Sequence, residues 1–200
     1  AKAVPDDAEI ATADDWNAVR ADERMRRFEE WGPQRGYSVV RHADGSIAAY
    51  PCPNARPRDL LWVRETHAIV GSIDPGFVLY RANGYENECR RHGFHNPPPE
   101  STIKWKPSIF MPRWASRISL RVASVRLERL QDITEADIIA EGVTVDRVAQ
   151  WCNVPWSSMP TLHHAWQVLW DHINGHGSWD ANPWVWPITF KRIETLRAAA

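Results

Sequence analysis

The stretch from Lys104 to Arg117 combines two residue types that suit a nucleotide ligand. It contains four cations and two tryptophans, with no carboxylate among them. Indole rings stack on nucleobases at about 1–3 kcal/mol per base, and arginine pairs with phosphate through a planar fork. The pattern therefore predicts binding of a nucleobase together with its phosphate. The alternative is that the tryptophans belong to the core and the cations to a solvated strand face, because tryptophan is usually largely buried.

Two glutamates are candidates for acid–base chemistry. Glu65 follows Arg64 at the end of a short apolar segment, where the two charges either form a structural ion pair or face the mouth of a barrel. Glu141 falls at the end of an expected helix, where the negative end of the helix dipole disfavours a charged carboxylate. Partial burial there would make Glu141 a candidate general acid or base, whereas full exposure would make it an ordinary surface residue.

Other motifs that carry chemistry are weak or missing. Cys89, His92 and His95 are ligand types at regular spacing, but they lack a fourth ligand at a typical distance along the chain. No phosphate-binding glycine loop, His-Glu-x-x-His or Gly-x-Ser-x-Gly motif occurs. His163 and His164 fall on an expected helix, where packing or exposure to solvent explains them. We therefore predict no metal and no cofactor.

The elements that hold these residues follow an α+β pattern, because strands are separated by short helices and long loops without regular β–α alternation. Apolar alternation predicts strands at 37–40 and 47–50, joined through Asp44-Gly45, and at 60–65, 77–82, 118–127 and 184–191. Caps and helical spacing predict helices at 14–31, at 134–141 and between Pro160 and Gly175. Segments 85–103 and 145–160 are predicted loops. We expect a small barrel or curled sheet with helices over its ends.

Charge is unevenly distributed along a nearly neutral chain. The 200 residues carry a formal net charge of −1, yet residues 104–129 hold seven bases and one acid. This local excess predicts contact with a few phosphates and argues against binding of a long duplex. Three widely spaced cysteines, no apolar run of about 18 residues and no signal-peptide pattern predict a cytoplasmic protein without a membrane span.

Several motifs together resemble one family. They are Pro57-Arg58-Asp59-Leu60-Leu61-Trp62-Val63-Arg64-Glu65-Thr66, Tyr80-Arg81-Ala82-Asn83-Gly84, the run from Lys104 to Arg117, the segment from Arg129 to Gly142 and the segment from Leu169 to Trp186. These motifs resemble those of the ASCH-domain proteins of phages and prophages, which belong to the PUA-like superfamily. The resemblance covers about residues 47–194, which leaves residues 1–46 as an N-terminal arm and residues 195–200 as a tail.

The resemblance implies a PUA-like curled β-barrel with short helices packed around it, and a nucleic acid or nucleobase as partner. Some small ASCH relatives hydrolyse the amide of N4-acetylcytidine, and others have been associated with RNA binding or RNA cleavage. In the amidohydrolase relatives a Lys, a Thr and a later Glu do the work, and Glu141 matches that Glu. None of the four lysines here precedes a Thr. We therefore expect the Lys–Thr segment to lie upstream of Ala1, or the family's first strand to be absent. Arg58 also stands where the related motif has a turn glycine.

Three functional hypotheses follow. The first is binding of RNA, another single-stranded nucleic acid or a modified nucleoside by residues lining one mouth of the barrel. Those residues are Arg64, Lys104, Trp105, Ser108, Met111, Arg113, Trp114 and Arg117. The second is hydrolysis of an N4-acylated cytosine nucleoside or of RNA, with Glu141 as general acid or base and Glu65 as a second catalytic candidate. Without the Lys–Thr segment we expect little or no turnover. The third is a phage accessory or structural protein whose tryptophans form a core or a protein interface.

Overall fold

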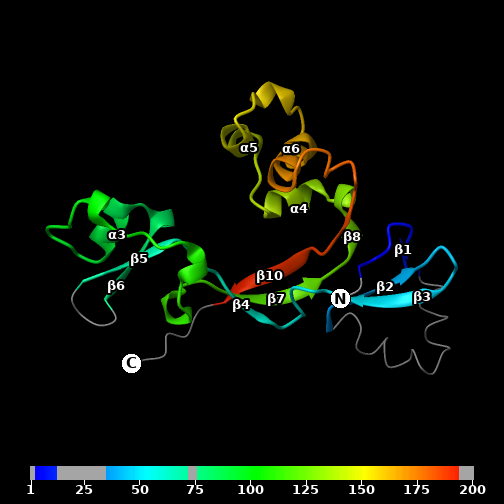
Figure 1. Cartoon of the computed structure of the whole chain (residues 1–200), viewed down its shortest axis with the longest axis horizontal. Coiled ribbons are helices and arrows are strands. Elements are labelled where there is room, and N and C mark those ends of the chain that lie inside the picture. Colours follow the sequence, from blue (N-terminus) through cyan, green and yellow to red (C-terminus); the bar gives the residue numbers. More distant parts are fainter. Residues whose placement is uncertain (1–2, 13–34, 72–75, 194–200) are drawn as a thin grey trace. The chain divides into compact units, whose positions relative to one another are not determined.

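The computed structural model describes residues 3–12, 35–71 and 76–193 (Figure 1). The protein is α+β, as predicted, and the described strands form four small sheets, none of which closes into a barrel. The described residues divide into two compact units. Unit 1 lies within 1–57 and 123–189, and unit 2 within 58–122 and 190–200. The helix predicted at 14–31 lies outside the described residues.

Unit 1 contains an antiparallel sheet in the order β1 (Glu9–Ile10), β2 (Tyr37–Arg41) and β3 (Ile47–Pro51). Gly45, in the turn between β2 and β3, has a φ of 80°, which a residue with a side chain rarely adopts. The Asp-Gly signal therefore predicted this hairpin correctly. Val40 and Tyr50 on its buried face form a core cluster with Ala8 and Leu127.

A two-stranded ribbon of β8 (Glu128–Arg129) and β9 (Trp184–Val185) holds the N-terminal segment. The indole N–H of Trp184 donates a hydrogen bond to the backbone carbonyl of Pro5 at 2.9 Å. The Arg129 guanidinium lies over the Trp184 ring, 4.2 Å from its centroid. Arg129 also donates to the backbone carbonyls of Asp6 and Asn182. Residues 3–12 are thus a packed part of unit 1.

The described part of unit 1 also contains three helices that lie side by side in Figure 1: α4 (Glu135–Ala140), α5 (Val145–Cys152) and α6 (Leu162–Asn174). Each begins with a threonine cap, because Thr134, Thr144 and Thr161 accept a hydrogen bond from the backbone N–H three residues later. Their shared core consists of Ile138, Val143, Val148, Met159, Ala165 and Leu169. Two 3₁₀ turns, η6 (Leu130–Asp132) and η7 (Trp156–Ser158), precede α4 and α6.

Unit 2 is built from the following elements: β4 (Leu60–Trp62), β5 (His67–Val70), β6 (Phe77–Tyr80), η2 (Arg81–Asn83), α3 (Tyr85–Arg91), η3 (Glu100–Thr102), η4 (Ser108–Phe110) and η5 (Arg113–Ala115). β5 and β6 form an antiparallel hairpin. β4 pairs with β7 (Ser119–Val125), which also neighbours β10 (Ile188–Ile193). β7 and β10 each run across the division between the units. Tyr80, Met111 and Ala115 form the buried core cluster, with Trp62 and Val78 packed against it.

Several predicted boundaries were wrong. The strand predicted at 60–65 ends at Trp62, and the strand predicted at 77–82 ends at Tyr80. The predicted closing strand divides at Pro187 into β9 and β10, because proline has no N–H for the ladder.

The loops predicted at 85–103 and 145–160 contain α3 and α5. α3 lacks an apolar stripe, since its buried residues are Glu88 and Cys89. None of the helices in the described ranges has the length and apolar character that a membrane crossing requires.

Arg58 has a left-handed backbone conformation, with a φ of 77°. Its N–H donates to the carbonyl of Val122 at 2.8 Å, and the Val122 N–H donates back to the carbonyl of Asp59 at 2.9 Å. These two bonds fix the chain where it enters β4. The position therefore favours glycine.

Candidate nucleic-acid interface

The positions of β4 and β7 bring Glu65 next to Arg117. Because these strands are antiparallel, Trp62 lies opposite Ser119, and the Val63 N–H donates to the carbonyl of Ile118 at 3.0 Å. The Glu65 carboxylate then accepts two hydrogen bonds from the Arg117 guanidinium, at 2.8 and 2.7 Å. The side chains are 11% and 25% exposed, respectively. Of the two alternatives left open by the sequence, the structure has an ion pair, but Glu65 forms it with Arg117 and not with Arg64.

A chain of polar contacts continues from this ion pair into α3. Asn83 accepts a hydrogen bond from Arg117 at 3.1 Å and donates to the carboxylate of Glu88. Glu88 is fully buried, and it also accepts from Arg91 at 2.8 Å and from the Tyr80 backbone N–H at 3.1 Å. Every charge in this chain therefore has an opposite charge or a hydrogen-bond partner, as burial requires.

Tyr80 lies at the centre of the same group. The guanidinium carbons of Arg117 and Arg91 lie 4.0 and 5.3 Å from the centroid of its ring. Its hydroxyl donates to the carbonyl of Ala115 at 2.7 Å. Burial raises the pKa of the Tyr80 hydroxyl, and the hydrogen bonds that Arg117 donates to Glu65 raise the pKa of Arg117. Tyr80 thus stays a neutral donor that holds the η5 turn in place.

A second group of arginines lies on the surface. The guanidinium carbons of Arg64 and Arg113 lie 4.8 and 5.6 Å from the centroid of the Trp62 ring. Both arginines are exposed, and within the described residues no carboxylate forms an ion pair with either. Trp114 follows Arg113 in the η5 turn and is 55% exposed. We call Trp62, Arg64, Arg113 and Trp114 the tryptophan–arginine surface.

The other predicted binding residues differ in their exposure. Met111 is 3% exposed and belongs to the core, where its Sδ accepts a hydrogen bond from the Glu65 N–H at 3.2 Å. Trp105 and Ser108 are partly buried, whereas Lys104 is exposed. Ile109 and Phe110 in the η4 turn are 66% and 65% exposed, and the sequence prediction did not include them.

Other residues important to this region were not singled out as site residues from the sequence. They are Trp62, Tyr80, Asn83, Glu88 and Arg91. Trp62 precedes Arg64 by two residues on an expected strand, and side chains two apart on a strand share a face. That spacing was a usable signal for the contact between Trp62 and Arg64. The sequence held no comparable signal for the contacts of Glu88, because its partners come from three different elements.

Glu141 belongs to unit 1, whereas Glu65 and the predicted binding residues belong to unit 2. It lies at the C-terminal cap of α4, and its backbone N–H donates to the carbonyl of Asp137 at 2.9 Å. It is exposed, so the partial burial that would favour an acid–base role is absent. Its catalytic role stays a prediction.

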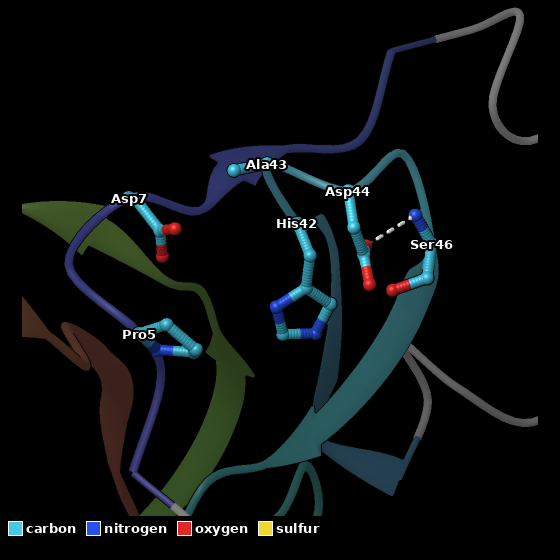
Figure 2. Close-up of a pocket in the computed structure, with 6 residues that line it drawn as sticks. All are labelled: Pro5, Asp7, His42, Ala43, Asp44 and Ser46. Carbon is cyan, nitrogen blue, oxygen red and sulfur yellow. Dashed lines mark hydrogen bonds between the residues drawn. The ribbon is translucent and has the colours of Figure 1, made fainter.

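Two open pockets are lined by described residues of unit 1. Figure 2 shows the first, with a volume of about 470 Å³, lined by Pro5, Asp7, His42, Ala43, Asp44 and Ser46. His42, Asp44 and Ser46 are the residue types of a catalytic triad, but they are not connected as one. Asp44 accepts from the backbone N–H of Ser46 at 2.8 Å, and His42 contacts the Tyr50 hydroxyl at 3.4 Å. Hydrogen bonds from Ser46 lower the pKa of Asp44. The pocket therefore lacks the base–nucleophile contact that such catalysis needs.

The second pocket, of about 510 Å³, lies along α6. Its lining residues are Cys152, Val154, His164, Gln167, Val168, Asp171, His172 and His176. Asp171 accepts from the backbone N–H groups of Trp179 and Gly177 and from the Ser178 hydroxyl. The hydrogen bond from Trp179 is the main cause of its lowered pKa. Asp171 thus anchors the loop after α6. Among the described residues, no group of three potential metal ligands occurs.

Comparison of the chain with known protein families, characterised proteins and solved structures finds no match. The tryptophan–arginine surface must therefore be interpreted from its own geometry.

Proposed function

We propose that unit 2 binds single-stranded nucleic acid, RNA in particular, or a modified nucleobase through the tryptophan–arginine surface. The main support is the contrast between two sets of arginines. Arg91 and Arg117 are held by carboxylates, whereas Arg64 and Arg113 have no carboxylate partner among the described residues. The exposed Trp114 lies directly beside the second set in the sequence. The proposal includes the PUA-like curled barrel that the ASCH resemblance implies and the cytoplasmic location that the cysteine pattern predicts.

The chemistry of the surface supports this ligand class. An unpaired guanidinium retains its donors for a phosphate, which it can bind in a planar fork. An exposed indole offers a flat face to any base, and stacking of this kind tolerates different sequences. The net charge of −1 means that attraction must come from this local group and not from the whole chain. Such a surface fits a short single strand better than a duplex.

Fluorescence titration with an eight-residue oligouridylate and its DNA counterpart, at several salt concentrations, tests the proposal. We expect quenching at low salt, and an affinity that falls with salt as the protein releases counterions from the strand. Arg113→Ala should weaken binding. Arg90→Ala is the matched control, because Arg90 is an exposed arginine on α3 whose side chain contacts Asn87. The absence of binding at low salt, or equal losses for the two variants, would count against the proposal.

A further inference from the structure

Two exposed arginines of unit 2 lie close to a single ring. Arg64 follows β4 and Arg113 begins the η5 turn, 49 positions later in the sequence, yet each lies within about 6 Å of the Trp62 centroid. Both groups are positively charged, and like charges repel each other. Here no carboxylate of the described residues pairs with either. This differs from Tyr80, where Glu65 and Glu88 compensate the two arginines that flank the ring.

Resting on the proposed function, we infer that Arg64 and Arg113 together hold one phosphate group, with Trp114 as the platform for the attached base. A single anion between two guanidinium groups relieves their repulsion and offers acceptors to both. The ligand class is therefore a phosphorylated nucleotide, either free or within a single strand, and not a bare nucleoside.

Two other arginines of the region, Arg117 and Arg91, fit this role less well. Arg117 uses its Nε and one terminal nitrogen on Glu65, and that same nitrogen also contacts Asn83. Arg91 is similarly held by Glu88. A phosphate would have to compete with these carboxylates, whereas no carboxylate of the described residues pairs with Arg64 or Arg113. Trp62 is partly buried, and both guanidinium groups lie close to its ring. Trp114 is therefore the more accessible ring for stacking.

The salt dependence of binding tests whether the two arginines share one phosphate. For a single strand, each phosphate contact contributes about 0.7 to the slope of log affinity against log salt. We expect the slope for octauridylate to fall by about 0.7 in the double variant Arg64→Gln/Arg113→Gln. The affinity losses of the two single variants should not add up to that of the double variant. A fall of about 1.4 with additive losses would mean two separate phosphates and would overturn the inference, as would an unchanged slope.

Three further arms complete the experiment. Trp114→Leu should lower affinity about tenfold without changing the slope, because a stacked base is lost and no charge is. Uridine monophosphate should compete better than uridine or inorganic phosphate. Vesicles containing phosphatidylglycerol should not bind, and binding to them but not to the oligonucleotide would assign the phosphate site to lipid. Arg90→Gln and the thermal transition of each variant control for charge and folding.

These outcomes separate the inference from the proposal beneath it. If the wild-type protein fails to bind octauridylate at low salt, the proposed function is wrong and the inference with it. If the wild type binds and the double variant loses affinity, but its slope falls by about 1.4 with additive single losses, only the shared phosphate site is wrong. Equal competition by uridine and uridine monophosphate would also reject the phosphate site while leaving nucleobase binding intact.

Discussion

The ion pair between Glu65 and Arg117 is predicted to be a principal stabilising contact of unit 2. Removing one member of a buried pair costs about 3–5 kcal/mol, whereas an exposed pair is worth about 0–1 kcal/mol. With side chains 11% and 25% exposed, this pair lies nearer the buried limit. Glutamine retains the shape of Glu65 and one acceptor oxygen. We therefore expect Glu65→Gln to lower the free energy of unfolding by about 2 kcal/mol.

Urea denaturation followed by tryptophan fluorescence measures this loss. For a protein of this size, each kcal/mol of lost stability lowers the melting temperature by about 2–4 °C, so we expect a fall of about 4–8 °C. Glu128→Gln is the matched control. Its partner Arg126 is 41% exposed and also pairs with Asp137, so we expect a loss of about 0.5 kcal/mol. A double-mutant cycle with Arg117→Met should give a coupling energy of about 2 kcal/mol. A coupling energy near zero, or equal losses for the two glutamate variants, would refute the reasoning.

Three further predictions concern the backbone, a buried donor and acid stability. Arg58→Gly should stabilise the protein by about 0.5–1 kcal/mol, because relief of left-handed strain exceeds the entropy cost of glycine; Arg58→Ala, which retains the strain, should show no such gain in urea denaturation. Tyr80→Phe removes the hydroxyl that donates to Ala115 and should lower the free energy of unfolding by about 1 kcal/mol. It should also weaken RNA binding, with the salt dependence of the affinity unchanged. A changed salt dependence would contradict a positioning role for Tyr80. The lowered pKa of Asp171 contributes stability that is present above the ordinary aspartate pKa of about 3.9 and is lost as pH falls through the lower folded value. Asp171→Asn should therefore be less stable at pH 7 and lose less stability between pH 5 and pH 2; parallel pH profiles would refute this assignment.

Elements with local signals were predicted well from the sequence. The β2–β3 hairpin depends on Asp44-Gly45, and α6 depends on an apolar stripe between a threonine cap and Gly175. α5 has comparable signals, with Thr144 as its cap and Val148 in the core, but its short stripe was not separated from the surrounding loop. α3 has no such signal. Its buried carboxylate, Glu88, is satisfied by residues that only the folded chain brings together.

The candidate site was predicted in composition but not in arrangement. The sequence indicated a run of tryptophans and cations, and it could not assign which arginine meets Glu65. Arg64 is the sequence neighbour of Glu65, yet the strand pairing places Arg117 there, 52 positions away. Because of this pairing, Arg117 is bound to a carboxylate. No carboxylate of the described residues pairs with Arg64 or Arg113. This difference between the arginines depends on the register of the antiparallel strands. A shift of one residue would turn each side chain of a strand to the other face of the sheet.

The two sets of arginines perform complementary tasks in this interpretation. Tyr80 and Arg117 hold the segment 113–117 at its middle and at its last residue, since the Tyr80 hydroxyl donates to the Ala115 carbonyl and Arg117 donates to Glu65. Arg113 and Trp114 begin that segment and remain exposed. A surface group that is already held in position loses less conformational entropy when it binds a ligand. The neutralised network around Tyr80 would therefore raise the affinity of the tryptophan–arginine surface without contacting the ligand, because it orders the η5 turn before binding occurs.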